Sequence, residues 1–102
     1  MTSISENEMK MITEIIQTSA TDCTVAVFGS RYNGSFKAYS DLDLVFTQKD
    51  GKRLGLERTS EIGFAFANSD LPYVVDVIDY NAVSDEFKAI INQGNFTLQE
   101  AE

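Results

Sequence analysis

Histidine is absent from the 102-residue sequence. Its absence excludes Ser-His-Asp and Cys-His catalysis, and it excludes metal sites that depend on histidine ligands. Cysteine occurs once, as Cys23, so no disulfide can form within the chain. We expect Cys23 to be a small packed residue at the start of a strand rather than a reactive thiol.

Basic residues are scarce: 8 lysines and arginines face 16 aspartates and glutamates, which gives a net charge of −8. No basic stripe is present, so the sequence disfavours autonomous binding of nucleic acid. An acidic surface instead suits a basic protein partner, or serves solubility alone. The sequence also has no signal-like segment and no long apolar run, so we expect a cytoplasmic protein without a membrane segment.

The length predicts a single domain over residues 1–102, with the first few residues and residues 97–102 frayed. Periodicity and turn residues predict alternating elements. The expected helices are 3–18, 30–36, 53–68 and 85–93, and the expected strands are 24–28, 41–47 and 73–80. The order αβαβαβα indicates an α/β (α+β) fold with a small mixed three-stranded sheet packed against helices.

Apolar spacing predicts which side chains of the helices face the core. The expected inward residues are Met9, Ile12, Ile15, Ile16, Leu56, Ile62, Phe64, Phe66, Phe87, Ile90 and Ile91. A capping box begins the first helix, formed either by Ser3 and Glu6 or by Ser5 and Glu8. Ser84 caps the last helix and Gly94 ends it. The acidic tail beyond is either frayed or a short added strand.

The stretch VFGSRYNGSFKAYSDLDLVF, residues 27–46, carries the candidate chemistry. Asp41 and Asp43 alternate with Leu42 and Leu44 along a strand, so the two carboxylates share one face and the leucines enter the core. Neighbouring carboxylates repel each other, and a cation between them offsets that repulsion. Mg²⁺ suits such a pair, since it takes one or two carboxylates and completes its shell with water and phosphate.

The corner at Gly29 and Ser30 points to phosphate. Glycine allows a ligand to approach the backbone closely, and serine can cap the following helix, whose N–H groups attract anions. Arg31 and Lys37 lie near this corner in the sequence and are either phosphate partners or ordinary surface charges.

A third carboxylate is expected from the strand YVVDVIDY, residues 73–80. Asp76 and Asp79 are three residues apart, so they face opposite sides and only one can join Asp41 and Asp43. We choose Asp76 because it lies deepest in the apolar run, where an unpaired charge costs most. Three carboxylates on two strands suit in-line phosphoryl or nucleotidyl transfer with two metal ions.

The pattern G-S-x10-D-x-D, from Gly29 and Ser30 to Asp41 and Asp43, resembles that of the polymerase-β-like nucleotidyltransferase superfamily. The stretches FGSRYNGSFKAYSDLDL and SDLPYVVDVIDY resemble its minimal nucleotidyltransferase (MNT) branch, over about residues 22–96. The resemblance implies that Gly29 and Ser30 bind the triphosphate of ATP, and we place Arg31 beside them as a candidate nucleotide-binding residue. It also implies that Asp41, Asp43 and Asp76 bind Mg²⁺, two ions in all, with Asp76 as the base.

The resemblance further implies an antitoxin that transfers AMP from ATP to a tyrosine hydroxyl of a helical HEPN-family RNase toxin. Two alternatives stay open: neutralisation of a HEPN partner by occlusion without catalysis, and transfer to a small molecule, as in aminoglycoside nucleotidyltransferases. The chain is too short to hold an acceptor-binding domain of its own, which favours a protein partner. Exposed apolar helix surface could serve a homodimer or that partner.

Overall fold

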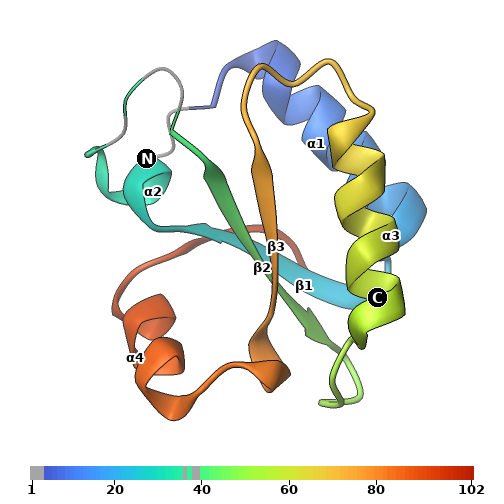
Figure 1. Cartoon of the computed structure of the whole chain (residues 1–102), viewed down its shortest axis with the longest axis vertical. Helices are drawn as coiled ribbons and strands as arrows, with labels where there is room; N and C mark the ends of the chain where they lie inside the picture. The colour runs from blue at the N-terminus through green and yellow to red at the C-terminus, as the bar shows by residue number, and fades with distance from the viewer. Residues whose placement is uncertain (1–3, 36, 38–39) are drawn as a thin grey trace.

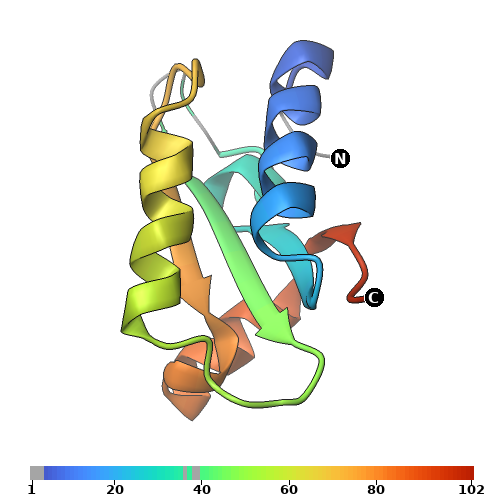
Figure 2. The ribbon, with the colours of Figure 1, turned by 90° about the vertical axis from the view of Figure 1, so that its right-hand side faces the viewer.

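The computed structural model describes residues 4–35, 37 and 40–102. A twisted sheet separates two unequal layers, with α1 and α3 on one face and α4 on the other (Figures 1 and 2). The elements are α1 (Glu6–Ser19), β1 (Cys23–Phe28), α2 (Ser30–Asn33), β2 (Leu42–Gln48), α3 (Leu56–Ala67), β3 (Val75–Asp79), the 3₁₀ helix η1 (Tyr80–Ala82), α4 (Asp85–Gln93) and β4 (Phe96–Gln99). No helix in the described part of the chain is long and apolar enough to cross a membrane.

The sheet has the strand order β3-β2-β1-β4. Strand β1 pairs antiparallel with β2 and with β4, whereas β2 and β3 are parallel and are joined through α3. The sheet is therefore mixed, as predicted, and the α/β class is confirmed. The count of three strands was wrong, because Phe96–Gln99 adds a fourth at the free edge of β1. The segment FTLQ alternates apolar and polar residues, and it pairs with the edge that β1 offers.

The end of β4 and the tail after it are held by hydrogen bonds to the start of β1 and to the residues just before it. The side-chain amide of Gln99 donates to the carbonyl oxygens of Ala20 (2.8 Å) and Cys23 (3.0 Å). The backbone N–H of Glu102 donates to the carbonyl of Thr21 at 3.0 Å. Of the two alternatives for the tail, the added strand is the one that the structure adopts.

Capping residues determine where helices α1 and α4 begin. Ser5 Oγ accepts from the N–H of Glu8, and Glu8 Oε1 accepts from the N–H of Ser5, both at 3.1 Å. The capping box is therefore Ser5 with Glu8; the alternative at Ser3 lies outside the described residues, as do the expected helix start at residue 3 and residue 36. Ser84 caps α4, as predicted, by accepting from the N–H of Phe87.

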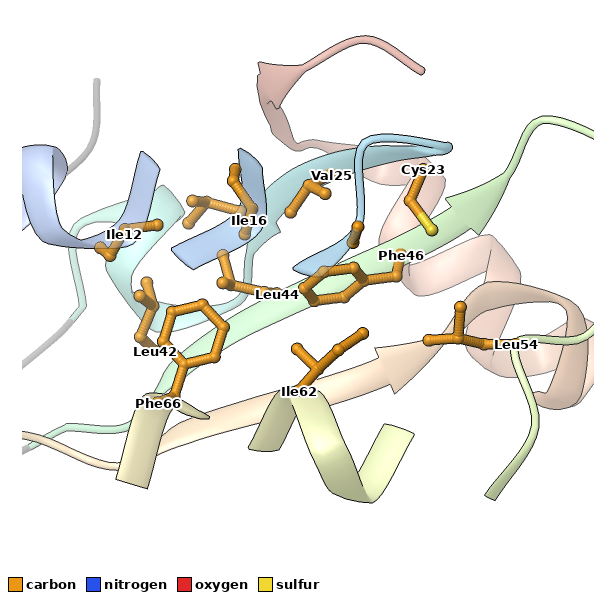
Figure 3. Packing of buried hydrophobic residues seen from close by; sticks show 12 residues of the cluster. Ile12, Ile16, Cys23, Val25, Leu42, Leu44, Phe46, Leu54, Ile62 and Phe66 are labelled. Carbon is orange, nitrogen blue, oxygen red and sulfur yellow. The ribbon is translucent and has the colours of Figure 1, made fainter. Parts of the chain in front are cut away.

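The main core lies between the sheet and the pair α1 and α3 (Figure 3). Leu42, Leu44 and Phe46 are fully buried there, which confirms the predicted alternation along β2. Cys23 is also fully buried, at the first position of β1, and burial raises its pKa to about 11. Its thiol therefore stays protonated at neutral pH, and the packed role is confirmed.

Several predicted core residues lie on the surface instead. Ile62 and Phe66 of α3 are buried, but Phe64 is 71% exposed and Leu56 85% exposed. Phe64 is two residues from each buried neighbour and so points away from the stripe they form. Helix α3 begins at Leu56 and not at residue 53, because Gly55 adopts φ +94° just before it.

A similar correction applies to α4. Ile91 is 2% exposed and Phe87 is half-buried, but Ile90 is 55% exposed. Adjacent residues on a helix are rotated by about 100°, so Ile90 and Ile91 cannot both face the sheet.

Candidate active site

The corner at Gly29 lies directly against Asp43. Strand β1 ends at Phe28, which is opposite Asp43 in the antiparallel register with β2. Gly29 then adopts φ +77° and ψ −153°, a backbone conformation that is essentially restricted to glycine. A Cβ atom at Gly29 would also overlap Oδ2 of Asp43. The backbone conformation and the lack of space for a Cβ atom therefore each require glycine here. At this position the backbone corner lies in contact with the carboxylate of Asp43.

Asp43 is paired with Asp76 across the parallel strands β2 and β3, where the two are direct register partners. Their neighbours Leu42, Leu44 and Val75 face the α1 and α3 side, so both aspartates lie on the face that carries α4. The pKa of Asp43 is raised to about 6, first by burial and then by the charge of Asp76, a hydrogen bond with Asp76 and the charge of Asp41. The ionised form of Asp43 is thus disfavoured without a cation.

Asp41 lies beside the pair formed by Asp43 and Asp76. It is exposed and immediately precedes β2, whose first residue, Leu42, donates its N–H to the carbonyl of Val74 at 2.9 Å. Asp41 is the weakest of the causes that raise the pKa of Asp43. Among the described residues no three acidic, cysteine or histidine side chains already form a metal-binding cluster. The structure therefore assembles a pair of carboxylates with a third close by.

Asp79 faces the other side of the sheet, as expected for a residue three positions from Asp76. Its Oδ2 accepts from the backbone N–H groups of Leu54 (2.7 Å) and Gly55 (3.3 Å), just before α3. The reason given for choosing Asp76 was wrong, however, because Asp76 is exposed and Asp79 is the more buried of the two. Helix α3 packs on the face of β3 that carries Asp79, so this face is more covered than the face that carries Asp76.

Helix α2 follows the corner and is a single turn. The N–H groups of Tyr32 and Asn33 donate to the carbonyl of Gly29, and the N–H of Gly34 donates to that of Ser30, all at 3.0 Å. Gly29 occupies the N-cap position, and this helix has no side-chain cap. The expected capping by Ser30 was therefore wrong, although Ser30 is the first residue of the helix and lies next to the corner.

Arg31 is buried inside the protein, with 3% of its surface exposed. Its Nε donates to the carbonyl oxygen of Ser40 at 3.0 Å, and its guanidinium lies 3.8 Å from the centre of the Tyr73 ring. Tyr73 in turn donates its hydroxyl to Glu8 Oε1 at 2.9 Å. The structure thus brings together Gly29, Asp43 and Asp76 but turns Arg31 inward, and Lys37 is exposed.

This arrangement links the two halves of the motif. Arg31 follows the glycine-serine corner, and Ser40 precedes Asp41, so their hydrogen bond joins the two segments across the intervening loop. Sequence spacing did not reveal this role, because the stacking partner Tyr73 is 42 residues away. The only local indication was an arginine next to a glycine-rich corner.

Residues 3–93 match the family described as the central palm domain of mitochondrial-like poly(A) RNA polymerase. Since this match spans most of the chain, the chain belongs to this family of nucleotidyltransferase palm domains and is a nucleotidyltransferase. The chain is also 38% identical, over 100 residues, to the probable protein adenylyltransferase MntA of Haemophilus influenzae. That alignment covers 97% of this chain and 85% of the relative.

Solved structures share the fold. A crystal structure of a toxin–antitoxin with AMP-PNP superimposes with a TM-score of 0.76 at 19% identity, covering 92% of this chain and 74% of that one. The toxin–antitoxin MntA–HepT superimposes with a TM-score of 0.71 at 16% identity, covering 95% and 74% respectively. At these identities the likeness establishes the fold alone.

Proposed function

We propose that the chain is an antitoxin that transfers AMP from ATP to a hydroxyl group, that of a tyrosine, on a HEPN-family toxin. The observation that carries this proposal is the contact of the Gly29 corner with Asp43, which is itself paired with Asp76. A backbone corner suits phosphate oxygens, and a carboxylate pair suits the cation that accompanies them. Family membership and the MntA relative support the same reaction.

The residues present fit Mg²⁺. The ionised form of Asp43 is disfavoured by burial and by the neighbouring Asp76, and a divalent cation would offset both effects. Mg²⁺ needs only one or two carboxylates when phosphate and water complete its shell. Asp41, Asp43 and Asp76 would hold the metal, two ions in the full proposal. Bound there, Mg²⁺ would neutralise charge on the triphosphate and on the leaving pyrophosphate.

The chain's own groups would act as follows. Gly29 and Ser30 bind the triphosphate and leave the α-phosphorus open to in-line attack. The acceptor oxygen forms a bond to that phosphorus, the bond to the bridging oxygen of the β-phosphate breaks, and pyrophosphate leaves. Asp76, which is exposed beside Asp43, takes the proton of the hydroxyl. We assign Arg31 no direct phosphate contact, because its side chain is buried in protein contacts.

The partner part of the proposal rests on charge and relatives. A net charge of −8 favours a basic partner, and the structural neighbours are toxin–antitoxin assemblies. A cytoplasmic location belongs to the same proposal. Neutralisation by occlusion is the alternative, and the exposed side chains of Leu56, Phe64 and Val74 favour it, since apolar surface of this kind suits a protein interface.

The test is co-expression with a candidate HEPN toxin, followed by incubation with ATP and Mg²⁺ and mass spectrometry of both proteins. We expect the toxin to gain AMP, and we expect Asp43→Asn to abolish the gain. Asp70→Asn is the matched control, since Asp70 is an exposed aspartate away from the site. If the toxin stays unmodified and the Asp43→Asn variant still neutralises it, catalysis is ruled out and neutralisation occurs by occlusion. Identifying the toxin residue that carries AMP then tests whether the acceptor is a tyrosine.

A further inference from the structure

An apolar groove of about 440 Å³ lies between α3 and the segment that leads into β3. Gly63, Phe66 and Ala67 of α3 form one wall, and residues 71–75 form the other. Helix α3 lies alongside β3 and packs against it (Figure 2). The groove therefore lies at an edge of the sheet, on the face that carries α1 and α3.

The lining of this groove is almost entirely apolar. Among the described residues that form it, Tyr73 alone has a polar side chain, and its hydroxyl already donates to Glu8 Oε1 at 2.9 Å. Small-molecule sites instead combine apolar walls with several convergent polar groups. Val74 in the wall is 63% exposed, and Phe64 on the same helix is 71% exposed. Exposed apolar surface of this kind is typical of a protein interface.

Strand β3 offers an open edge beside the groove. In the described part of the chain it pairs with β2 alone, so its outer N–H and C=O groups can pair with an added strand. Its sequence, VDVID, contains no lysine or proline, which commonly block such an edge. A helix cannot use these groups, because its own backbone is already bonded internally. An extended peptide can pair with the edge and place alternate side chains in the groove.

Charge distinguishes between the chains that could pair with this edge. Residues 59–87 contain no lysine or arginine, so every charged side chain from α3 to the start of α4 is acidic. Two copies of this chain paired edge to edge would place the aspartates of one β3 against those of the other. Like charges in such positions destabilise a sheet. A segment that carries basic residues meets opposite charge instead.

We propose that the toxin binds this edge through an extended segment that pairs with β3, places apolar side chains in the groove against α3 and carries lysine or arginine. The inference rests on the proposed function and adds to it the docking surface and the form of the bound segment. Side chains alternate along a strand, so every second residue of the segment faces the side that carries Asp76. The toxin is thereby held at the rim of the proposed active site.

Gly63→Gln tests the groove. Gly63 lies within α3, and no described atom lies within 4 Å of an added Cβ, so the fold accepts a larger side chain. The glutamine fills the groove, and we expect the candidate HEPN toxin to bind about tenfold more weakly in calorimetry. Gly63→Ala adds only a methyl group and should weaken binding less than about threefold. Thr18→Gln is the matched control, because it places the same side chain at an exposed position of α1 and should leave the affinity unchanged.

A pair of variants at Val74 tests the charge. Val74→Lys and Val74→Glu both replace an exposed apolar side chain with a longer charged one. Only the lysine repels a basic segment, so at low salt Val74→Lys should bind the toxin about tenfold more weakly than Val74→Glu. The difference should shrink at high salt, because exposed charges are screened there. Equal affinities of the two variants would overturn the basic character of the segment.

Hydrogen exchange of the complex tests the added strand. We expect the outward N–H groups of β3, Val75–Asp79, to exchange about tenfold or more slowly when the toxin is bound, because they become hydrogen-bonded. Protection confined to α3 would show that the partner fills the groove without pairing with the strand, and the proposal would fail.

Transfer kinetics separate this proposal from the proposed function. Gly63→Gln should keep the kcat of AMP transfer and raise the KM for the toxin, because the groove lies on the opposite face from Asp43. If Gly63→Gln and Val74→Lys bind the toxin as tightly as wild type, the docking surface is wrong, although AMP transfer stands. If wild type neither binds nor modifies the toxin, both proposals fail.

Discussion

The carboxylate of Asp43 occupies the space that a side chain at Gly29 would need. Gly29 directly follows β1, Asp43 lies on β2, and the pairing of Phe28 with Asp43 in the strand register brings them into contact. The metal half and the phosphate half of the proposed site are therefore a single packed unit. A change in either residue should disturb both.

Gly29→Ala should destabilise the fold and abolish AMP transfer. The alanine meets a glycine-only backbone region and the Asp43 carboxylate together, so we expect a loss of about 2–4 kcal/mol in the free energy of unfolding. Gly55→Ala is a close control, because Gly55 also has positive φ (+94°, ψ 154°) at a helix N-cap but nothing lies within 4 Å of an added Cβ. It should lose only about 1–3 kcal/mol and keep activity. Urea unfolding and transfer assays compare the two, and equal effects on both would contradict the packed-unit interpretation.

Asp43→Asn should stabilise the metal-free protein at neutral pH while it abolishes transfer. The folded-state pKa of Asp43, about 6, exceeds the ordinary value of 3.8, so the folded protein holds the proton more tightly. Stability contributed by this group is present below pH 3.8, declines as pH rises, and is lost above about pH 6. In EDTA at pH 7 the variant should gain on the order of 1–2 kcal/mol, with little gain at pH 4.

Denaturant unfolding at the two pH values measures this difference, with Asp70→Asn as the exposed control. Mg²⁺ should then raise the melting temperature of the wild type and not that of Asp43→Asn, because a ligand stabilises only the state that binds it. A variant that is less stable than wild type in EDTA at pH 7 would contradict the unfavourable ionisation of Asp43.

Substitutions of the two aspartates of β3, Asp76 and Asp79, should have different effects on transfer and on stability. Asp76→Asn should abolish transfer with little change in stability, because Asp76 is exposed. Asp79→Asn should retain transfer but lose about 1–3 kcal/mol of stability, because its carboxylate accepts from the N–H groups of Leu54 and Gly55. Steady-state transfer rates together with thermal unfolding distinguish them. Equal loss of transfer in both variants would contradict the assignment of the two side chains to opposite faces.

Arg31→Lys should disturb the position of the site segments that Arg31 holds together and should leave phosphate binding unchanged. Lysine keeps the charge but loses both the Nε hydrogen bond to Ser40 and the planar stacking on Tyr73. We expect about 1–3 kcal/mol of destabilisation and a lower kcat, with the affinity for tripolyphosphate unchanged. Tyr73→Phe keeps the ring and removes only the bond to Glu8, so it should be milder. A weakened affinity for tripolyphosphate in Arg31→Lys would instead restore the direct phosphate role.

Local sequence information determined the motif and the order of the α-helices and strands from α1 to α4. The cap at Ser84 and the core face of Leu42, Leu44 and Phe46 each depend on residues within a few positions of one another, and such patterns can be read from a single segment. The glycine at position 29 was also identified from the sequence. Its contact with Asp43 was not, because that contact depends on strand register.

Tertiary structure decided what depends on distant partners. The pairing of Asp43 with Asp76, the inward turn of Arg31 onto Tyr73 and the addition of β4 to β1 all join segments more than thirty residues apart. Exposure of Phe64 and Ile90 likewise depends on which stripe of each helix meets the sheet. Apolar residue types occur both in the core and on the surface, so only packing distinguishes the apolar side chains that stabilise this fold from those that stay exposed.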